Sequence, residues 1–249
     1  MRYAWALQED YFGRGGLKRA LIDRLLARLR RWDVAANERV DRFVAISRHV
    51  QKRIETFYGR EAAVVYPPVA TQFFTPGDAA GSGDYDLIVS ALVPYKRVDL
   101  AVRAYAQLGT PLKIAGVGTE WDALRASAPP NVEFLGRVPD EGIRELYRGC
   151  RFLIFPGEED FGIVPLEAQA CGKPVVALGR GGLLETVVAG TTGVFFAEQT
   201  PEALAAAVRD AAQREWQPAT IRAHAEQFSE ARFLDGLRAE INKLLAGRG

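Results

Sequence analysis

Along residues 86 to 196, the spacing of apolar residues switches repeatedly between that of a strand and that of a helix. Short apolar runs, typical of buried strands, are each followed by a segment with helical spacing. The predicted strands are Asp86 to Ala91, Leu112 to Ala115, Val132 to Leu135, Phe152 to Phe155, Val175 to Leu178 and Val194 to Phe196, with helices from Lys96, Glu120, Asp140, Pro165 and near Leu183. Such alternation predicts a parallel sheet covered on both faces, which is one complete Rossmann-like α/β domain.

Before residue 75 the sequence predicts fewer strands and helices. Two strand-like runs, 41 to 47 and 62 to 66, enclose a helix, and a further helix is predicted over 17 to 34. That is too little for a second full sheet. Residues 75 to 84 are rich in Gly, Pro, Ser and Asp and form the predicted linker. We expect three parts: an N-terminal α/β portion at 1–76, the Rossmann-like domain at 77–216, and C-terminal helices at 217–249 that pack back on the first part.

Composition narrows the class of protein. A chain of 249 residues that is 48% hydrophobic and 25% charged is typical of a soluble globular protein with a sizeable core. The net charge of +1 argues against a general nucleic-acid binder. No apolar run approaches the roughly 18 residues of a membrane span. Cys150 and Cys171 have apolar neighbours and no metal-ligand spacing, which predicts small core residues in a reducing, cytoplasmic compartment.

The loop after the strand at 152 to 155 carries the candidate chemistry. It leads into a helix whose first turn suits Pro165, so it lies at the carboxyl edge of the sheet, where ligands bind. A helix N-terminus favours an anion such as a diphosphate, and Gly162 allows close approach of the backbone. Glu159 and Glu167 would repel phosphate, so we expect them to accept hydrogen bonds from sugar or ribose hydroxyls. A nucleotide sugar combines these parts.

Residues 156 to 168, Pro-Gly-Glu-Glu-Asp-Phe-Gly-Ile-Val-Pro-Leu-Glu-Ala, resemble the donor-binding signature of the retaining glycosyltransferases of family four. That signature is two Glu separated by seven residues, with Phe-Gly after the first and Glu-Ala at the second. The match extends to residues 172 to 176 and to Gly181-Gly182. The resemblance implies a GT-B architecture, in which two Rossmann-like halves face each other across a cleft. This chain would be the C-terminal half with a truncated N-terminal portion, lacking much of the acceptor-binding domain.

Lys96 lies in Val93-Pro94-Tyr95-Lys96-Arg97, which follows a strand and opens a helix at the same edge. A lysine there can meet a phosphate as a point charge, although a solvated lysine is the alternative. Relatives use the Lys of this motif on the donor diphosphate. Many of them also carry an Arg where this chain has Ala91, so either that contact is missing or Arg97 supplies it.

Two further segments are donor-site candidates. Gly116 in Gly116-Val117-Gly118 follows a strand, which suits either close backbone approach to a ligand or a plain tight turn. Arg137 and Val138 end a segment that resembles the family region whose backbone meets the nucleobase. Main-chain groups serve any base, so its identity cannot be predicted.

No metal and no cofactor are expected. Asp84-Tyr85-Asp86 spells Asp-x-Asp, but it lies at the amino end of its strand, away from the ligand edge, and is predicted to be part of the linker and cap. His49 and His224 have no neighbouring residue that suggests a catalytic pair, and surface positions are expected for both.

Residues 14 to 32 form a predicted basic amphipathic helix. Apolar residues recur at helical spacing among many arginines, at Leu17, Leu21, Leu25, Leu29 and Trp32. This helix could make a peripheral contact with the anionic inner face of the membrane or pack on the protein's own core, and both alternatives stay open. The strands Phe43 to Ile46 and Ala63 to Val65 would leave apolar edges, so we expect a homo-oligomer.

The resemblance implies a cytoplasmic, metal-independent glycosyltransferase. It would move a sugar, with retention, from a UDP- or GDP-sugar to a glycan or lipid-linked acceptor. Lys96 and the amides of Phe161, Gly162 and Ile163 would stabilise the leaving diphosphate, Glu159 would orient the sugar, and Glu167 would bind the ribose. The amino-acid sequences of these motifs are most similar to those of bacterial mannosyltransferases of surface-polysaccharide biosynthesis. The alternative is a non-catalytic nucleotide-sugar-binding module, completed by a partner chain or by self-association.

Overall fold

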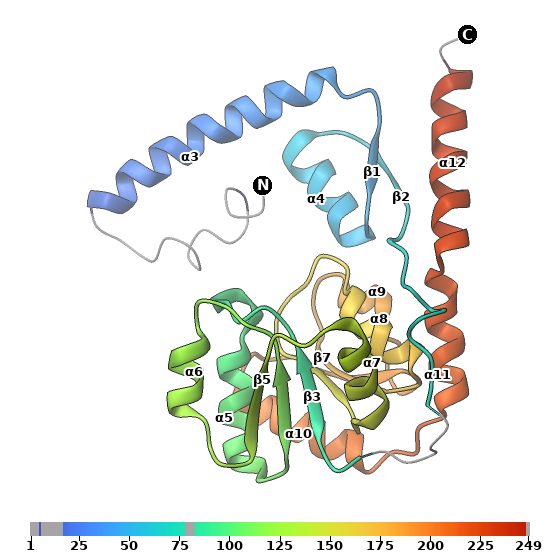
Figure 1. The fold of residues 1–249 in the computed structure, drawn as a ribbon. Coiled ribbons are helices and arrows are strands. Elements are labelled where there is room, and N and C mark those ends of the chain that lie inside the picture. The colour runs from blue at the N-terminus through green and yellow to red at the C-terminus, as the bar shows by residue number, and fades with distance from the viewer. Residues whose placement is uncertain (1–4, 6–16, 78–82, 248–249) are drawn as a thin grey trace.

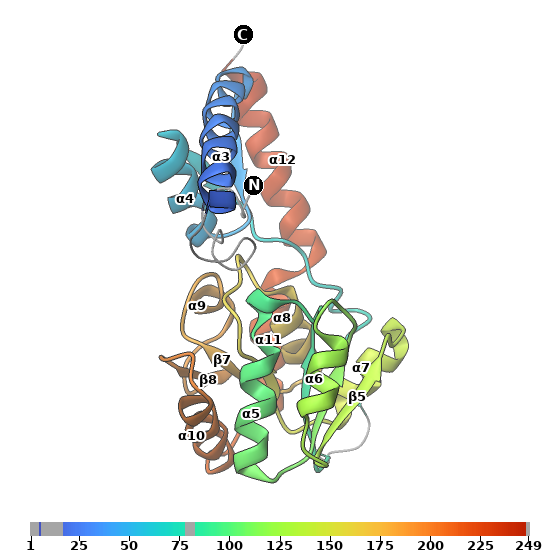
Figure 2. The same cartoon turned by 90° about the vertical axis from the view of Figure 1, so that its left-hand side faces the viewer.

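The computed structural model describes Trp5 and residues 17–77 and 83–247. It consists of two parts, one above the other in Figures 1 and 2. The lower part is built on a large sheet, and the upper part holds two short strands and the helices around them. Residues 14–16 of the predicted basic helix lie outside the described ranges.

All six strands of the lower sheet are parallel, as predicted. They are β3 (Asp86–Val89), β4 (Leu112–Ala115), β5 (Val132–Gly136), β6 (Leu153–Phe155), β7 (Val175–Leu178) and β8 (Gly193–Phe196), in the order β5-β4-β3-β6-β7-β8. The chain builds outward from β3 in one direction and then returns to place β6 on the other side. The strand order therefore reverses between β3 and β6, and the carboxyl ends of these two strands are where a Rossmann-like sheet binds its ligand.

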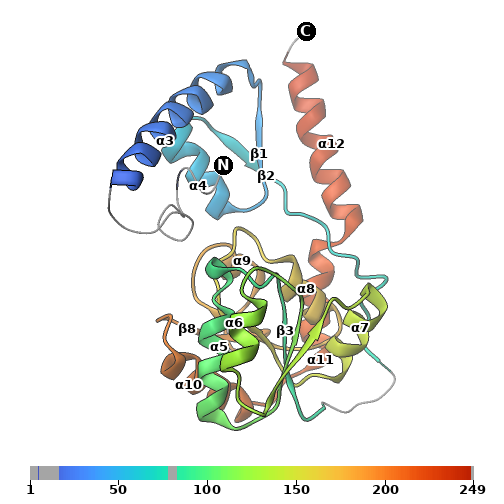
Figure 3. The same cartoon turned by 60° about the vertical axis from the view of Figure 1, so that its left-hand side comes forward.

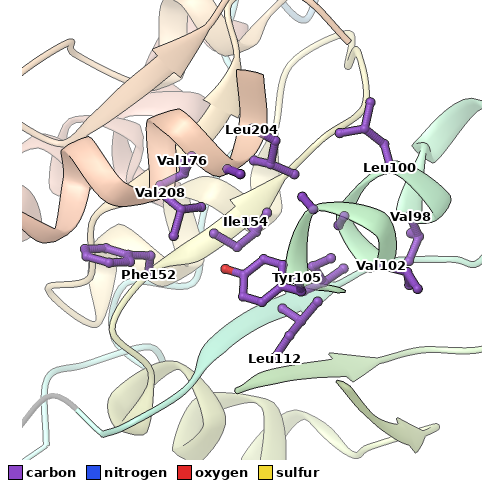
Figure 4. Packing of buried hydrophobic residues seen from close by; sticks show 14 of the residues in the cluster. Val98, Leu100, Val102, Tyr105, Leu112, Phe152, Ile154, Val176, Leu204 and Val208 are labelled. Atoms are coloured by element: carbon purple, nitrogen blue, oxygen red, sulfur yellow. The ribbon is translucent and has the colours of Figure 1, made fainter. Parts of the chain in front are cut away.

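Helices cover both faces of this sheet. They are α5 (Val98–Leu108), α6 (Trp121–Ser127), α7 (Asp140–Gly149), α8 (Ile163–Ala170), α9 (Leu183–Thr186) and α10 (Pro201–Ala212). Successive strand residues point to opposite faces, so Ile154 packs in one core cluster and Leu153 and Phe155 in the other. Figure 4 shows side chains of α5 and α10 meeting over β6, with Tyr105 beside Ile154. Burial on both faces explains why each strand appears as a continuous apolar run.

The upper part contains α3 (Leu17–Ala36), the 3-10 turn Asn37–Arg39, β1 (Phe43–Ala45), α4 (Arg48–Tyr58) and β2 (Ala62–Val64). β1 and β2 pair in parallel. The Ser47 hydroxyl caps α4 by accepting from the Val50 amide, and Gly59 ends the helix in a left-handed conformation with φ 61°. Within the described ranges, no helix combines the length and apolarity needed to cross a bilayer.

Two C-terminal helices connect the parts. α11 (Pro218–Ala225) packs on α8, and after the turn Glu226–Phe228, α12 (Glu230–Ala246) extends along the upper part (Figure 3). There Arg42 Nε donates to Glu240 Oε2 over 2.7 Å. At the junction, the amide of Val69 donates to the carbonyl of Phe228 over 2.8 Å, so both passages of the chain between the parts run side by side.

One helix begins later than the sequence predicted. The segment expected to be helical from Lys96 begins with a 3-10 turn at Pro94–Lys96, and α5 starts only at Val98. Between them Arg97 adopts a left-handed conformation with φ 55°. This turn changes the direction of the chain before α5, and a run of apolar periodicity does not reveal such a change.

Candidate functional site

A cavity of about 430 Å³ lies at the carboxyl edge of the sheet, where the strand order reverses. Its lower walls include Lys96, Glu159 and the first residues of α8. Ile46 and Pro67 of the upper part also line it, so the cavity lies between the two parts. A cavity therefore lies at the sheet edge that was predicted to bind the donor, and residues of both parts form the walls of that cavity.

The N-terminus of α8 faces this cavity through Phe161, Gly162 and Ile163. Gly162 precedes the helix with φ 103°, and a Cβ at this position would lie 2.9 Å from Cδ2 of Leu183. Only glycine fits here without a shift of its neighbours. The first amides of a helix have no acceptor within it, so this end of α8 can bind an anion.

Lys96 and Glu159 form an ion pair. Their side chains are only 16% and 20% exposed, and the ammonium of Lys96 also lies 5.4 Å from the centre of the Phe155 ring. The other carboxylate oxygen of Glu159 accepts the amide of Asp160 over 3.0 Å. The predicted phosphate cation and the predicted sugar-binding acid are thus in direct contact.

Glu167 lies one helical turn after Ile163 and has a different environment. Its Oε2 accepts the hydroxyl of Tyr147 over 2.9 Å. Burial raises the pKa of the Glu167 carboxyl, the Tyr147 hydrogen bond opposes that rise, and the nearby Asp140 adds to it. Tyr147 was not among the predicted site residues. Its position on the buried side of α7 was the available signal, because a buried phenol needs a polar partner.

Gly116, Arg137 and Val138 line a second cavity of about 350 Å³ at the same edge. It shares wall residues with the first one, among them Ser90 and Ala91. Gly116 has φ 136°, and a Cβ would lie 1.8 Å from the carbonyl oxygen of Ser90. The tight turn therefore requires glycine whether or not a ligand approaches.

Arg97 is turned away from these predicted neighbours. It lines neither of the two cavities, and its Nε donates to Asp99 Oδ1 over 3.1 Å. Of the predicted residues, Lys96, Glu159, Phe161, Gly162 and Ile163 meet at one cavity, and Gly116, Arg137 and Val138 at the other. Neither Glu167, on α8, nor Arg97 lines either cavity.

Asp86 of the Asp-x-Asp segment is fully buried at the amino end of β3. Its carboxylate accepts the Tyr105 hydroxyl over 2.6 Å and two nitrogens of Arg151 over 3.0 and 2.7 Å. Burial raises the pKa of this carboxyl, and both partners oppose the rise. Within the described ranges, no three or more His, Cys, Asp or Glu residues are grouped to hold a metal ion.

The cysteines are buried and unbridged, as predicted, and burial raises the pKa of each thiol to about 12. The surface position expected for His224 was wrong. Its ring is half-buried, and Nδ1 lies 2.8 Å from Oε1 of Gln169 on α8. The polar sequence around His224 gave no sign of this contact with a second helix.

A larger cavity of about 570 Å³ lies at the opposite edge of the sheet. Residues just before β6 and β7 line it, including Arg151 and Lys173, together with Trp216 and with Pro218, the first residue of α11. It contains none of the predicted site residues. We therefore assign the candidate site to the carboxyl edge.

The six-stranded parallel sheet, with Lys96, Glu159 and the N-terminus of α8 at its switch point, matches the Rossmann-like domain of GT-B proteins. The family described as glycosyl transferases group 1 matches residues 78–231, and the chain belongs to this family.

Curated relatives agree with this assignment. A D-inositol 3-phosphate glycosyltransferase of Geodermatophilus obscurus is 34% identical over 241 residues, covering 80% of this chain and 52% of the relative. A GDP-mannose-dependent alpha-(1-6)-phosphatidylinositol monomannoside mannosyltransferase of Mycolicibacterium smegmatis is 32% identical, covering 66% of this chain and 51% of the relative. The chain thus spans about half the length of these curated relatives.

Solved structures share the fold. Anabaena HepE, in complex with UDP-glucose, superposes with a TM-score of 0.76 at 22% identity, covering 86% of this chain and 67% of that protein. At this identity the likeness establishes the fold alone.

Proposed function

We propose that the chain binds a nucleoside diphosphate sugar at the carboxyl edge of β3 and β6 and takes part in glycosyl transfer with retention at the anomeric carbon. The observation that carries the proposal is the cavity in which Lys96, Glu159 and the N-terminus of α8 meet. A cation and free amides suit a diphosphate, and a carboxylate suits sugar hydroxyls. The relative from Mycolicibacterium smegmatis, a GDP-mannose-dependent enzyme, supports a donor of this class.

The residues would share the work electrostatically. As the bond to the sugar breaks, negative charge grows on the leaving diphosphate, and Lys96 together with the first amides of α8 would stabilise it. A bound diphosphate would compete with Glu159 for the lysine. Glu159 would then turn its acceptor oxygens to the sugar hydroxyls and orient the donor.

Glu167 would bind the ribose. A carboxylate offers about four acceptor positions, and the hydroxyl of Tyr147 uses one of them at Oε2. Arg137, Val138 and Gly116 would border the nucleobase and ribose in the adjoining cavity. We propose UDP or GDP as the nucleotide and mannose as a candidate sugar, with a glycan or lipid-linked acceptor of polysaccharide biosynthesis.

A second function is a non-catalytic donor-binding module completed by another chain or by a second copy. The observation that favours it is that the chain spans about half the length of its curated relatives. The two functions differ in turnover. Purified protein with UDP- and GDP-sugars would show donor binding by calorimetry in both cases, but release of the free nucleoside diphosphate only if the chain is active. Absence of binding to any nucleotide would contradict both.

We further propose that no metal is required. Phosphate charge would be met by Lys96 and by α8, so addition of EDTA should leave donor affinity and any turnover unchanged. Loss of either in EDTA, with recovery on adding Mg²⁺ or Mn²⁺, would refute this. The control is the same titration in a buffer treated to remove divalent ions beforehand.

The upper part suggests how the protein could associate. Leu21, Leu25 and Trp32 of α3 are 61%, 60% and 60% exposed and lie on a helix with several arginines. We propose that this face contacts a second copy in a homo-oligomer, with a peripheral contact at the inner membrane face of a cytoplasmic protein as the alternative. Binding of liposomes that contain anionic lipid would favour the alternative.

A further inference from the structure

The carboxylate of Glu185 on α9 contacts the upper part through three hydrogen bonds. The amides of Arg48 and His49 donate to it over 2.9 and 3.0 Å, and the hydroxyl of Tyr66 donates over 3.0 Å. Arg48 and His49 are the first two residues of α4, whose amides have no acceptor within the helix. A negative group at this end is also favoured by the helix dipole. An acid of the lower part thus caps a helix of the upper part.

The same end of α4 holds the loop that carries Glu159. Ser47, which is fully buried, donates its hydroxyl to the carbonyl oxygen of Asp160 over 2.6 Å. From the next turn of α4, Arg53 Nη1 forms an ion pair with Asp160 Oδ1 at 2.8 Å. The residue that follows Glu159 is therefore bound to the upper part through both its main chain and its side chain.

The loop is also tied to the turn that leads into α9. The amide of Gly182 donates to the carbonyl of Glu159 over 2.8 Å, and the amide of Glu185 donates to the carbonyl of Gly182 over 3.0 Å. These bonds and those of α4 form a closed ring of contacts around the base of the loop. Tyr66 adds a stacked contact with Phe161, at a centroid distance of 5.6 Å.

We infer that Glu185 is a positioning residue for the donor site: by fastening the first turn of α4, it holds the loop of Glu159 at the edge of the cavity. Glu185 itself does not line that cavity, so it acts through α4 and the loop. The inference rests on the proposed function. It also assigns a role to residues 47–53, since in this arrangement the upper part shapes the site that binds the donor.

The test is hydrogen–deuterium exchange of Glu185→Gln followed by mass spectrometry. Glutamine keeps the shape, but its NH₂ group would face the amides of α4 and oppose the cap. We expect exchange to become at least tenfold faster in peptides covering 47–53 and 158–163, with no change in β3 and β7. Glu185→Asp, which keeps the charge, should restore part of the protection. Glu215→Gln, at an exposed position after α10, is the matched control and should change nothing.

Faster exchange at 47–53 with unchanged exchange at 158–163 would overturn the inference and leave Glu185 as a helix cap only. If Glu185→Gln unfolds the whole chain, Tyr66→Phe decides, because it removes one of the three donors. It should speed exchange at 158–163 while leaving β3 and β7 unchanged, and no change at 158–163 would likewise overturn the inference.

A binding measurement adds a functional readout. Because the loop carries both Glu159, assigned to the sugar, and the amides of residues 161–163, assigned to the diphosphate, Glu185→Gln should weaken binding of the nucleotide sugar by at least fivefold more than binding of the free nucleoside. Equal losses for the two ligands would count against the positioning role. If the unaltered protein binds neither ligand, the proposed function fails, while the exchange result still decides whether Glu185 controls the loop.

Discussion

The two acids of the donor motif have different partners. Glu159 is paired with the cation of Lys96, whereas Glu167 is paired with the neutral phenol of Tyr147 in a setting whose burial raises its pKa. A carboxylate without a nearby counter-ion has a strong need for further hydrogen-bond donors. Ribose hydroxyls would meet that need, and this is the physical basis for assigning Glu167 to the ribose.

Glu167→Ala should therefore remove most of the nucleotide affinity. Loss of the acceptor of a pair of ribose hydroxyls costs about 1 to 3 kcal/mol. Calorimetry with the nucleoside diphosphate measures it, and Glu141→Ala, on the exposed side of α7, is the control. Unchanged affinity in a folded Glu167→Ala variant would disprove the ribose assignment.

Lys96→Ala should weaken binding of the nucleoside diphosphate far more than binding of the free nucleoside, because the lysine is assigned to the phosphate charge. Hydrogen bonds to charged groups contribute about 1.5 to 3 kcal/mol, so a loss of that size is expected for the diphosphate alone. Titration of both ligands into one preparation makes the comparison. Losses of the same size for both would place Lys96 outside the phosphate site.

At the scale of elements, α8 is held by its neighbours on either side. His224 of α11 contacts Gln169 of α8, and the amide of that glutamine donates to the carbonyl of Thr186 in α9 over 2.7 Å. The hydroxyl of Thr186 in turn donates to the carbonyl of Phe161 over 3.2 Å. This chain of hydrogen bonds connects a C-terminal helix to the first residues of the donor helix.

This connection predicts a pH dependence of stability. Burial lowers the pKa of His224 below its ordinary value of 6.5, so the unfolded chain binds a proton more readily than the folded one. Stability is therefore complete above about pH 6.5 and declines as the pH falls through that value toward the folded pKa. We expect the urea midpoint to drop between pH 7.5 and 5.5.

His224→Gln should make that drop smaller, because it removes the half-buried ring whose pKa is lowered. An equal drop in the unaltered protein and in His224→Gln would assign the pH dependence to other groups.

The elements themselves were largely predictable. The strands β3 to β8 lie at the predicted positions because burial on both faces requires an apolar run at each. The contacts between residues of the site were less predictable. Nothing near Tyr147 in the sequence points to Glu167, and Arg48 and Glu185 are 137 residues apart. Such pairs depend on how the chain returns in space, which local periodicity does not encode.

At the scale of the whole molecule, apolar side chains remain exposed on the upper part. Besides Leu21 and Leu25 of α3, these include Val44 of β1 at 40% and Leu245 of α12 at 63%. A two-stranded sheet with exposed edges and faces is a surface that other polypeptides can cover. This is the structural reason to expect association.

Leu21→Glu with Leu25→Glu should dissociate the proposed oligomer, because it places two charges in an interface expected to bury more than roughly 1,000 Å². Light scattering at tens of micromolar measures the mass, and Val188→Glu, at an exposed apolar position of the lower part, is the matched control. A monomer in the unaltered protein, with no liposome binding, would contradict both forms of association.

The junction at Val69 and Phe228 also limits how the two parts can move relative to each other. Within the described residues, the backbone passes between the parts only there, and a hydrogen bond joins the two passages. A single clamp would leave a swivel. Here α4 provides a second attachment to the lower part, through Ser47, Arg53 and the cap by Glu185. The two parts therefore cannot turn about the junction unless those contacts break, so the width of the cavity between them depends on both attachments.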